Sequence, residues 1–173
     1  MLIKVSGCLL VIAATTLSGA LRAERIKEEY RQMRNLQRLL CMIESEIRYA
    51  HTHLGEIFLH AARRTQEPYR SWLLDMEKRM DEADSGVFEK IWGQAASEKL
   101  SGAGLPKKEL ERLIQLGGQL GVMDLKLQLE VLALYQEQLR LSMEEVWEGM
   151  GAKVRLCHCL GVMSGLLVAV MLI

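Results

Sequence analysis

The distribution of charge along the chain is the feature that most limits what it can fold into. Of the 44 charged side chains, 43 lie within residues 22–155, and only Lys4 lies outside that range. The 17 residues of 5–21 and the 18 residues of 156–173 contain no Asp, Glu, Lys or Arg. A helix that crosses a bilayer needs about 20 mainly apolar residues, with about 17 as the lower limit. We therefore predict a transmembrane helix over residues 1–21, a polar domain over 22–155 and a second transmembrane helix over 156–173.

The first apolar segment has two other interpretations. A cleaved signal peptide needs a small-residue cleavage site, and Ala20-Leu21-Arg22-Ala23 offers one with an unfavourable arginine. A lipoprotein has its modified cysteine after the apolar stretch, whereas Val5-Ser6-Gly7-Cys8 places the cysteine before it. Both sites are poor, and we predict that the mature protein retains this segment.

Basic residues flank both apolar segments on the side of the polar domain. Arg22, Arg25 and Lys27 follow the first segment, and Lys153 and Arg155 precede the second. Lys and Arg accumulate in the cytoplasmic flanks of membrane spans, so residues 22–155 are expected to face the cytoplasm. Lys4 alone favours the opposite orientation.

Two long stretches of the polar domain repeat apolar residues with the heptad spacing of packed helices. In the first stretch, two interleaved series each advance by seven: Ile26, Met33, Leu40, Ile47 and Leu54, and then Leu36, Ile43, Ala50 and Ile57. In the second, the steps alternate between four and three, with one polar member: Leu125, Leu129, Leu132, Gln136, Leu139, Met143, Val146 and Met150. We call these rows the first and second seams. Two helices anchored in one membrane run antiparallel, so the seams are expected to pack together.

Shorter helices are expected between the two seams. Apolar spacing and prolines predict them over about 54–64 and 68–82, then from Ser85, which is suited to cap, and from Pro106. Residues 101–106 form the clearest loop, and Gly117, Gly118 and Gly121 are expected to interrupt the last of these helices. Gly149 and Gly151 are expected to kink the final helix. The predicted fold class is all-α: a helical bundle with long antiparallel N- and C-terminal helices, each continuous or nearly so with a terminal transmembrane helix.

Several residue clusters resemble chemical sites but lack the required spacing. His51, His53 and His60 belong to no zinc motif, and we interpret them as cap and surface residues. Cys157-His158-Cys159 has one residue between its thiols, which is not a metal-ligand spacing. Glu44 and Glu46 point to different sides of a helix. The glycines of 117–121 match no phosphate-binding loop.

We therefore assign no catalytic, cofactor-binding or metal-binding residue and expect a protein that is not an enzyme and holds no cofactor. Lys and Arg together number 22, as do Asp and Glu, so the net charge is zero and no basic excess indicates nucleic acid as a partner.

Three motifs resemble the stage III sporulation protein AB family of endospore-forming bacteria. Residues 34–40 (RNLQRLL) resemble the family, and residues 44–54 (ESEIRYAHTHL) resemble its signature E-x-E-I-x-Y-G-H-T-P-L, with Ala50 in place of glycine and His53 in place of proline. Residues 116–121 (LGGQLG), followed by Asp124 and Gln128, are similar to the second signature, L-G-x-x-L-G-x-x-D with a later glutamine. Residues 160–167 (LGVMSGLL) resemble the C-terminal span. Despite the two replacements, Thr52 is expected to cap the next helix.

The resemblance implies a role in the complex that joins mother cell and forespore during engulfment. The family's helical domain is similar to the inner-membrane platform protein of type II secretion and type IV pilus machines. The partners implied by the resemblance are the membrane lipid bilayer, the other stage III sporulation proteins, a cytoplasmic ATPase and, as a candidate, a second copy of the chain. The implied location is the mother-cell or outer forespore membrane, with the central domain facing the cytoplasm. A membrane-anchored coiled-coil signalling or adaptor protein is the alternative function, and a neighbouring ATPase gene would favour the platform.

Overall fold

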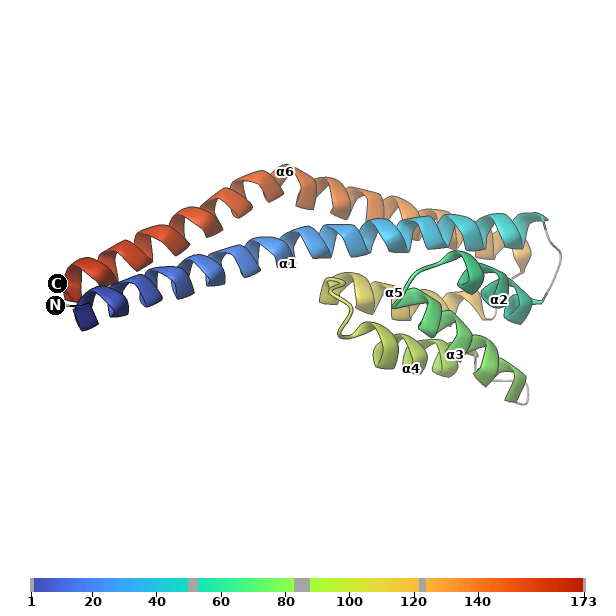
Figure 1. Cartoon of the computed structure of the whole chain (residues 1–173). Helices are drawn as coiled ribbons and strands as arrows, with labels where there is room; N and C mark the ends of the chain where they lie inside the picture. The colour runs from blue at the N-terminus through green and yellow to red at the C-terminus, as the bar shows by residue number, and fades with distance from the viewer. Residues whose placement is uncertain (1, 50–52, 83–87, 122–123, 173) are drawn as a thin grey trace. The chain divides into compact units, whose positions relative to one another are not determined.

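The computed structural model describes residues 2–49, 53–82, 88–121 and 124–172, which Figure 1 shows as helices. The side chains of residues 2–6, 8–12, 165, 166 and 168–172 lie outside the described set. Within these ranges the chain forms six helices and no strand: α1 (Leu2–Tyr49), α2 (Leu54–Arg64), α3 (Tyr69–Glu82), α4 (Phe88–Leu100), α5 (Lys107–Leu120) and α6 (Leu125–Leu172). The predicted all-helical bundle is confirmed.

The first and last helices are each continuous over 48 residues. They therefore extend without a break from the polar region into the uncharged ends, as the sequence predicted, and α6 continues through Gly149 and Gly151. Among the described residues, no helix contains a stretch long and apolar enough to cross a membrane. Much of both predicted transmembrane segments, 1–21 and 156–173, lies outside the described side chains. The two membrane spans stay predictions.

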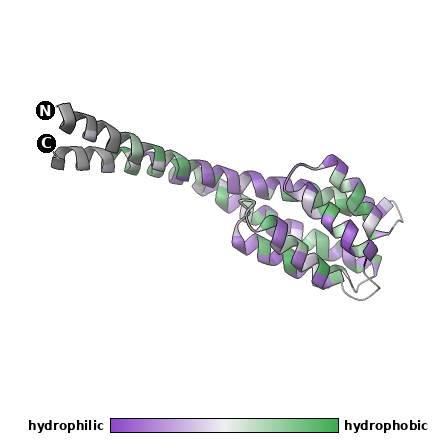
Figure 2. Ribbon diagram, turned by 60° about the horizontal axis from the view of Figure 1, so that its bottom comes forward, coloured by the Kyte–Doolittle hydropathy of each residue, from purple (hydrophilic) through white to green (hydrophobic). Residues whose placement is uncertain are grey.

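The chain divides into two compact units: residues 1–30 with 144–173, and residues 31–143. In the first unit, α1 and α6 meet backbone to backbone at two glycines. A Cβ atom added to Gly19 would lie 2.6 Å from the Cys157 carbonyl oxygen, and one added to Gly161 would lie 3.0 Å from the Thr15 carbonyl oxygen. The rings of Tyr30 and Trp147 also meet, with centroids 5.2 Å apart. Figure 2 colours the described part of this unit nearest the grey ends as hydrophobic.

In the second unit, most residues of the predicted seams are buried. Those of α1 are Met33, Leu36, Leu40, Ile43 and Ile47, and those of α6 are Leu132, Leu139 and Met143. The prediction was wrong at the start of the second seam, where Leu125 in the first turn of α6 is exposed. Ala50 lies outside the described residues, and Leu54 and Ile57 belong to α2 because α1 ends at Tyr49.

An aromatic cluster fills the space between the shorter helices, where α2 packs on α3, α3 on α4 and α4 on α5. The edge of one indole meets the face of the other at Trp72 and Trp92, whose centroids are 4.8 Å apart. Phe58 of α2 and Phe88 of α4 also lie against Trp92, with centroids 6.0 and 5.7 Å from it. Both tryptophans are fully buried, so α4 is held to α2 and α3 by large apolar contacts.

The bounds of the shorter helices follow the sequence prediction closely, with one correction at a helix start. The residue that caps α2 is His53, in extended backbone conformation, and its side chain makes no capping hydrogen bond. The prediction of Thr52 as the cap is therefore wrong. Thr52 and Ser85, the cap predicted for α4, lie outside the described residues. Residues 101–106 form the predicted loop, in which Gly104 has a positive φ of 81°.

The predicted break at Gly117 and Gly118 was wrong. Both glycines lie inside α5, which ends at Leu120. The physical reason is packing rather than turn formation: a Cβ atom at Gly117 would lie 2.1 Å from Cδ1 of Trp92. The glycine leaves room for the indole, whose Nε1 donates a hydrogen bond of 2.7 Å to the carbonyl oxygen of Leu113.

Candidate functional site

The histidines and cysteines that drew attention in the sequence do not come together. His53 and His60 are both exposed, at the start and on the surface of α2, and His51 lies outside the described residues. Among the residues that the structure describes, no three His, Cys, Asp or Glu side chains are grouped so that they could hold a metal ion. Cys157 and Cys159 are free thiols on α6.

A half-buried polar contact lies at the edge of the seam, where the sequence placed Gln136. The Gln136 side-chain amide donates to Glu44 Oε2 at 3.0 Å, and its Oε1 accepts from the Cys41 thiol at 3.3 Å. Glu44 is also paired with Arg48, one turn later on α1, and it does not associate with Glu46. Burial, and beyond it the Glu44 carboxylate, raises the pKa of Cys41, which keeps the thiol protonated as a donor. This contact fixes the register of α1 against α6.

A buried polar network joins α5 and α6. Glu109 is only 2% exposed, although it lies in the first turn of α5. Its Oε1 accepts a hydrogen bond of 3.0 Å from Arg112, which also reaches the Ser142 hydroxyl at 3.2 Å. The Tyr135 hydroxyl donates to the Glu109 carbonyl oxygen at 3.2 Å. Burial, and next the charge of Glu109, raises the pKa of Tyr135 far above its ordinary value.

This network was not predicted from the sequence, although the helical register of α5 indicated that Glu109 is buried. Glu109 precedes the buried residues Leu113, Leu116 and Leu120 at helical spacing, so it lies on the apolar face of α5. A charged residue on such a face is expected to be paired. A similar buried contact links α3 to α1, where the Tyr69 hydroxyl donates to the Gln32 carbonyl oxygen at 2.9 Å.

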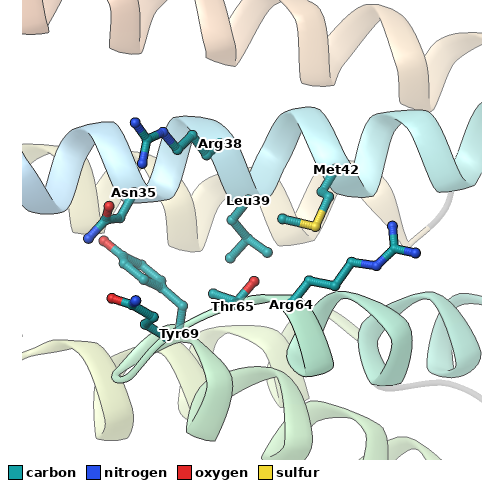
Figure 3. Close-up of a pocket in the computed structure, with 8 residues that line it drawn as sticks. Asn35, Arg38, Leu39, Met42, Arg64, Thr65 and Tyr69 are labelled. Carbon is teal, nitrogen blue, oxygen red and sulfur yellow. The ribbon is translucent and has the colours of Figure 1, made fainter.

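A small recess opens on the surface between α1 and the turn that joins α2 to α3 (Figure 3). We call it the arginine recess because Arg38 and Arg64 stand at its two sides. It has a volume of about 190 Å³ and is lined by Asn35, Arg38, Leu39 and Met42 of α1, and by Arg64, Thr65, Gln66 and Tyr69. Leu39 and Met42 point from α1 toward the turn (Figure 3). Sequence reasoning did not single out these residues as a site, because α1 and the turn meet only in the folded chain.

The described contacts hold helices together, and the arginine recess lies at the surface outside them. In these contacts, carboxylate, amide and hydroxyl groups of different helices form hydrogen bonds with one another. Glu109 Oε2 and Trp72 Nε1 are buried without a hydrogen-bond partner among the described residues.

Comparisons with known proteins agree with the resemblance seen in the sequence. The profile of the family described as "Stage III sporulation protein AB" matches residues 4–173. The chain is similar to stage III sporulation protein AB of Bacillus subtilis (strain 168), with 26% identity over 171 residues that cover 99% of each chain. It is also similar to a solved structure of stage III sporulation protein AB, with 27% identity and a TM-score of 0.64, over 72% of this chain and 97% of that one. Because the family profile spans nearly the whole sequence, this chain belongs to the stage III sporulation protein AB family.

Proposed function

We propose that this protein is a non-enzymatic, membrane-anchored structural subunit of the sporulation complex between mother cell and forespore. The observation that carries the proposal is the family match over residues 4–173. In this role the chain is a platform, similar to the platform proteins of type II secretion machines. It stands in the mother-cell or outer forespore membrane with its polar domain in the cytoplasm, beside other stage III sporulation proteins and a cytoplasmic ATPase.

The packing of the uncharged ends supports the membrane anchor. Gly19 and Gly161 let the α1 and α6 backbones approach closely, with 3.3 Å between a Cβ placed on Gly19 and the Gly161 Cα atom. Helices in a bilayer gain little from the hydrophobic effect, so their contacts rely on close packing at small residues. Close packing of this kind suits two transmembrane helices that lie side by side.

The interior of residues 31–143 supports a scaffold role. Three buried side chains donate hydrogen bonds to carbonyl oxygens of other helices: Tyr69 to Gln32, Trp92 to Leu113, and Tyr135 to Glu109. Each bond restricts how two helices can slide along one another, because the donor would be left buried and unpaired. A subunit held in this way can support partners without changing its own shape.

Genetic complementation in the source organism tests the proposal. Deleting the gene should strongly reduce heat-resistant spores, and the full chain should restore them and fractionate with membranes. Gly19→Ile should restore fewer spores, because its side chain meets the Cys157 carbonyl. Gly7→Ile is the matched control, since nothing lies within 4 Å of an added Cβ there. Normal sporulation without the gene, or recovery of the full chain in the soluble fraction, would contradict the proposal.

A further inference from the structure

Arg38 and Arg64 of the recess, together with the neighbouring Arg34, form a local excess of positive charge without a counterion among the described residues. Arg34 and Arg38 lie one turn apart on α1, and like charges at this spacing destabilise a helix. Among the described residues, no acidic side chain pairs with Arg34, Arg38 or Arg64. The C-terminal end of the α2 dipole accounts for Arg64, but no helix end explains Arg34 or Arg38.

The nearest acidic residue in the sequence of the turn is already engaged. Glu67 follows the recess residues Thr65 and Gln66, and its carboxylate accepts hydrogen bonds from the backbone amide and the hydroxyl of Ser71. The chain contains 22 acidic residues and is neutral overall, so the local imbalance reflects the placement of the charges and not the composition.

The lining of the recess has a chemistry that matches an acidic side chain. Its eight described residues include two arginines and no Asp or Glu. Leu39 is buried and Met42 half-buried, so the α1 side of the recess is apolar and suits the methylene stem of a glutamate. Asn35 and Gln66 add amide donors at the sides. A volume of about 190 Å³ is several times the ~30 Å³ share of one water molecule, which is enough for one side chain.

The cations of the recess are arginines, and this choice favours a carboxylate held in a fixed geometry. A guanidinium group presents a planar fork that pairs with a carboxylate through two parallel hydrogen bonds, whereas lysine acts as a point charge. An anionic lipid surface attracts outward-facing cations in general, so it would not distinguish the recess arginines from exposed arginines outside the recess. Arg38 and Arg64 stand at opposite sides (Figure 3), so a segment with more than one acidic residue can reach both.

We propose that the arginine recess binds an acidic segment of a protein partner, with carboxylates paired to Arg38 and Arg64. This inference rests on the proposed function, in which the chain is a platform for other proteins, and it identifies the face that meets one of them. The partner is defined by its chemistry: an exposed peptide segment carrying closely spaced Glu or Asp residues.

Binding of a labelled peptide to the purified full chain in detergent tests the inference. The probe is fluorescein-labelled hexaglutamate, measured by fluorescence anisotropy, and hexaglutamine is the uncharged control. Arg38→Glu and Arg64→Glu should each weaken hexaglutamate binding about tenfold or more, because each replaces a pairing group with a repelling one. Arg63→Glu is the matched control. It makes the same change of charge at an exposed residue adjacent to Arg64 but outside the recess lining, and it should weaken binding less than about threefold.

Three results would overturn the inference. Hexaglutamate could fail to bind, or Arg63→Glu could weaken it as much as Arg64→Glu. The third result concerns phosphatidylglycerol vesicles. If the chain binds these vesicles, Arg38→Glu abolishes the binding and hexaglutamate does not compete with the vesicles, the recess would be a lipid site. Arg38, Arg63 and Arg64 are exposed, so their variants should keep the circular dichroism spectrum of the original chain. A chain that binds hexaglutamate but is dispensable for sporulation would support this inference and contradict the proposed function. A chain that is required for sporulation but does not bind hexaglutamate would contradict the inference alone.

Discussion

At the scale of single residues, Gly117 shows how one missing side chain can determine a local packing arrangement. Ala in place of Gly normally stabilises a helix interior by up to about 1 kcal/mol. At Gly117 the added Cβ would lie 2.1 Å from Cδ1 of Trp92, and the indole is held by its hydrogen bond to Leu113. Overpacking typically costs about 1–3 kcal/mol. Because the clash outweighs the propensity gain, we expect Gly117→Ala to lower the free energy of unfolding by about 2 kcal/mol.

Gly93 provides the control for this prediction. It lies inside α4, and a Cβ there would meet only Cγ2 of Ile114 at 3.4 Å, an ordinary contact. Gly93→Ala should leave the thermal midpoint of the full chain unchanged or raise it, whereas Gly117→Ala should lower it by several degrees. Equal midpoints for the two variants would show that Trp92 does not depend on the glycine.

The buried Tyr135 hydroxyl should make the free energy of unfolding depend on pH in the alkaline range. Burial and Glu109 raise the pKa of Tyr135 in the folded chain, while in the unfolded chain it titrates at about 10. The folded state therefore keeps a proton that the unfolded state releases. The contribution of protonated Tyr135 to the free energy of unfolding is complete below about pH 10. Above that pH it is lost, by up to about 1.4 kcal/mol per pH unit.

Replacing Tyr135 by Phe should remove this loss. The variant should cost about 1 kcal/mol near pH 8, because the hydrogen bond to the Glu109 carbonyl is lost, but its stability should fall less steeply above about pH 10. Tyr49→Phe is the control, since Tyr49 is 77% exposed. Thermal unfolding between pH 8 and 11 measures both variants. Parallel pH profiles for Tyr135→Phe and the original chain would exclude Tyr135 as the group responsible.

At the scale of helices, the buried seam between α1 and α6 should dominate the stability of residues 31–143. Leu40 and Leu132 are fully buried, so truncating either to Ala should cost about 2–5 kcal/mol through lost burial and a cavity. The control lies on the outer row of α6, where Leu134 is 61% exposed. Leu134→Ala should change the free energy of unfolding by less than about 0.5 kcal/mol. A larger loss at Leu134 than at Leu132 would mean that the outer row is covered.

The sequence predicted this part of the fold well because heptad spacing records burial directly. Leu36, Leu40 and Ile43 were placed on one face by spacing alone, and all three are buried. Spacing alone does not show where a seam ends, and Leu125 in the first turn of α6 is exposed although it follows the spacing. Loop chemistry was equally direct at 101–106, where Gly and Pro set the turn.

The features that sequence reasoning missed depend on contacts between distant segments. Gly117 indicated a break because propensity is local, whereas its role is set by Trp92, 25 residues earlier in the sequence. Glu109 was passed over because the residues that complete its network lie on α6: Tyr135 donates to its carbonyl oxygen, and Ser142 is bound by Arg112. The arginine recess has no motif at all, since its two walls belong to α1 and to the turn after α2. For such sites the register can reveal an unusual residue, but only the fold can supply its partners.

At the scale of the whole molecule, the distribution of charge remains the main guide to how the chain is placed in the cell. The polar domain carries basic residues next to both uncharged ends: Arg22, Arg25 and Lys27 at one end, and Lys153 and Arg155 at the other. If both ends cross a membrane, these flanks predict that residues 22–155 stay in the cytoplasm. Ser101 is exposed in the turn between α4 and α5, which makes it a suitable reporter position.

We expect a cysteine at Ser101 to be labelled by a membrane-impermeant maleimide only after cells are lysed. The background must first lose Cys8, Cys41, Cys157 and Cys159, because Cys41 and Cys159 are exposed thiols that would react as well. Ser101→Cys should be silent in the folding assays, since its side chain is exposed in a turn. A cysteine introduced at Ser97, exposed on α4, should give the same pattern, because both positions belong to the polar domain. Labelling of both cysteines in intact cells would place the domain outside the cytoplasm. The basic flanks would then be on the outer side of the membrane, and a platform role beside a cytoplasmic ATPase would be untenable.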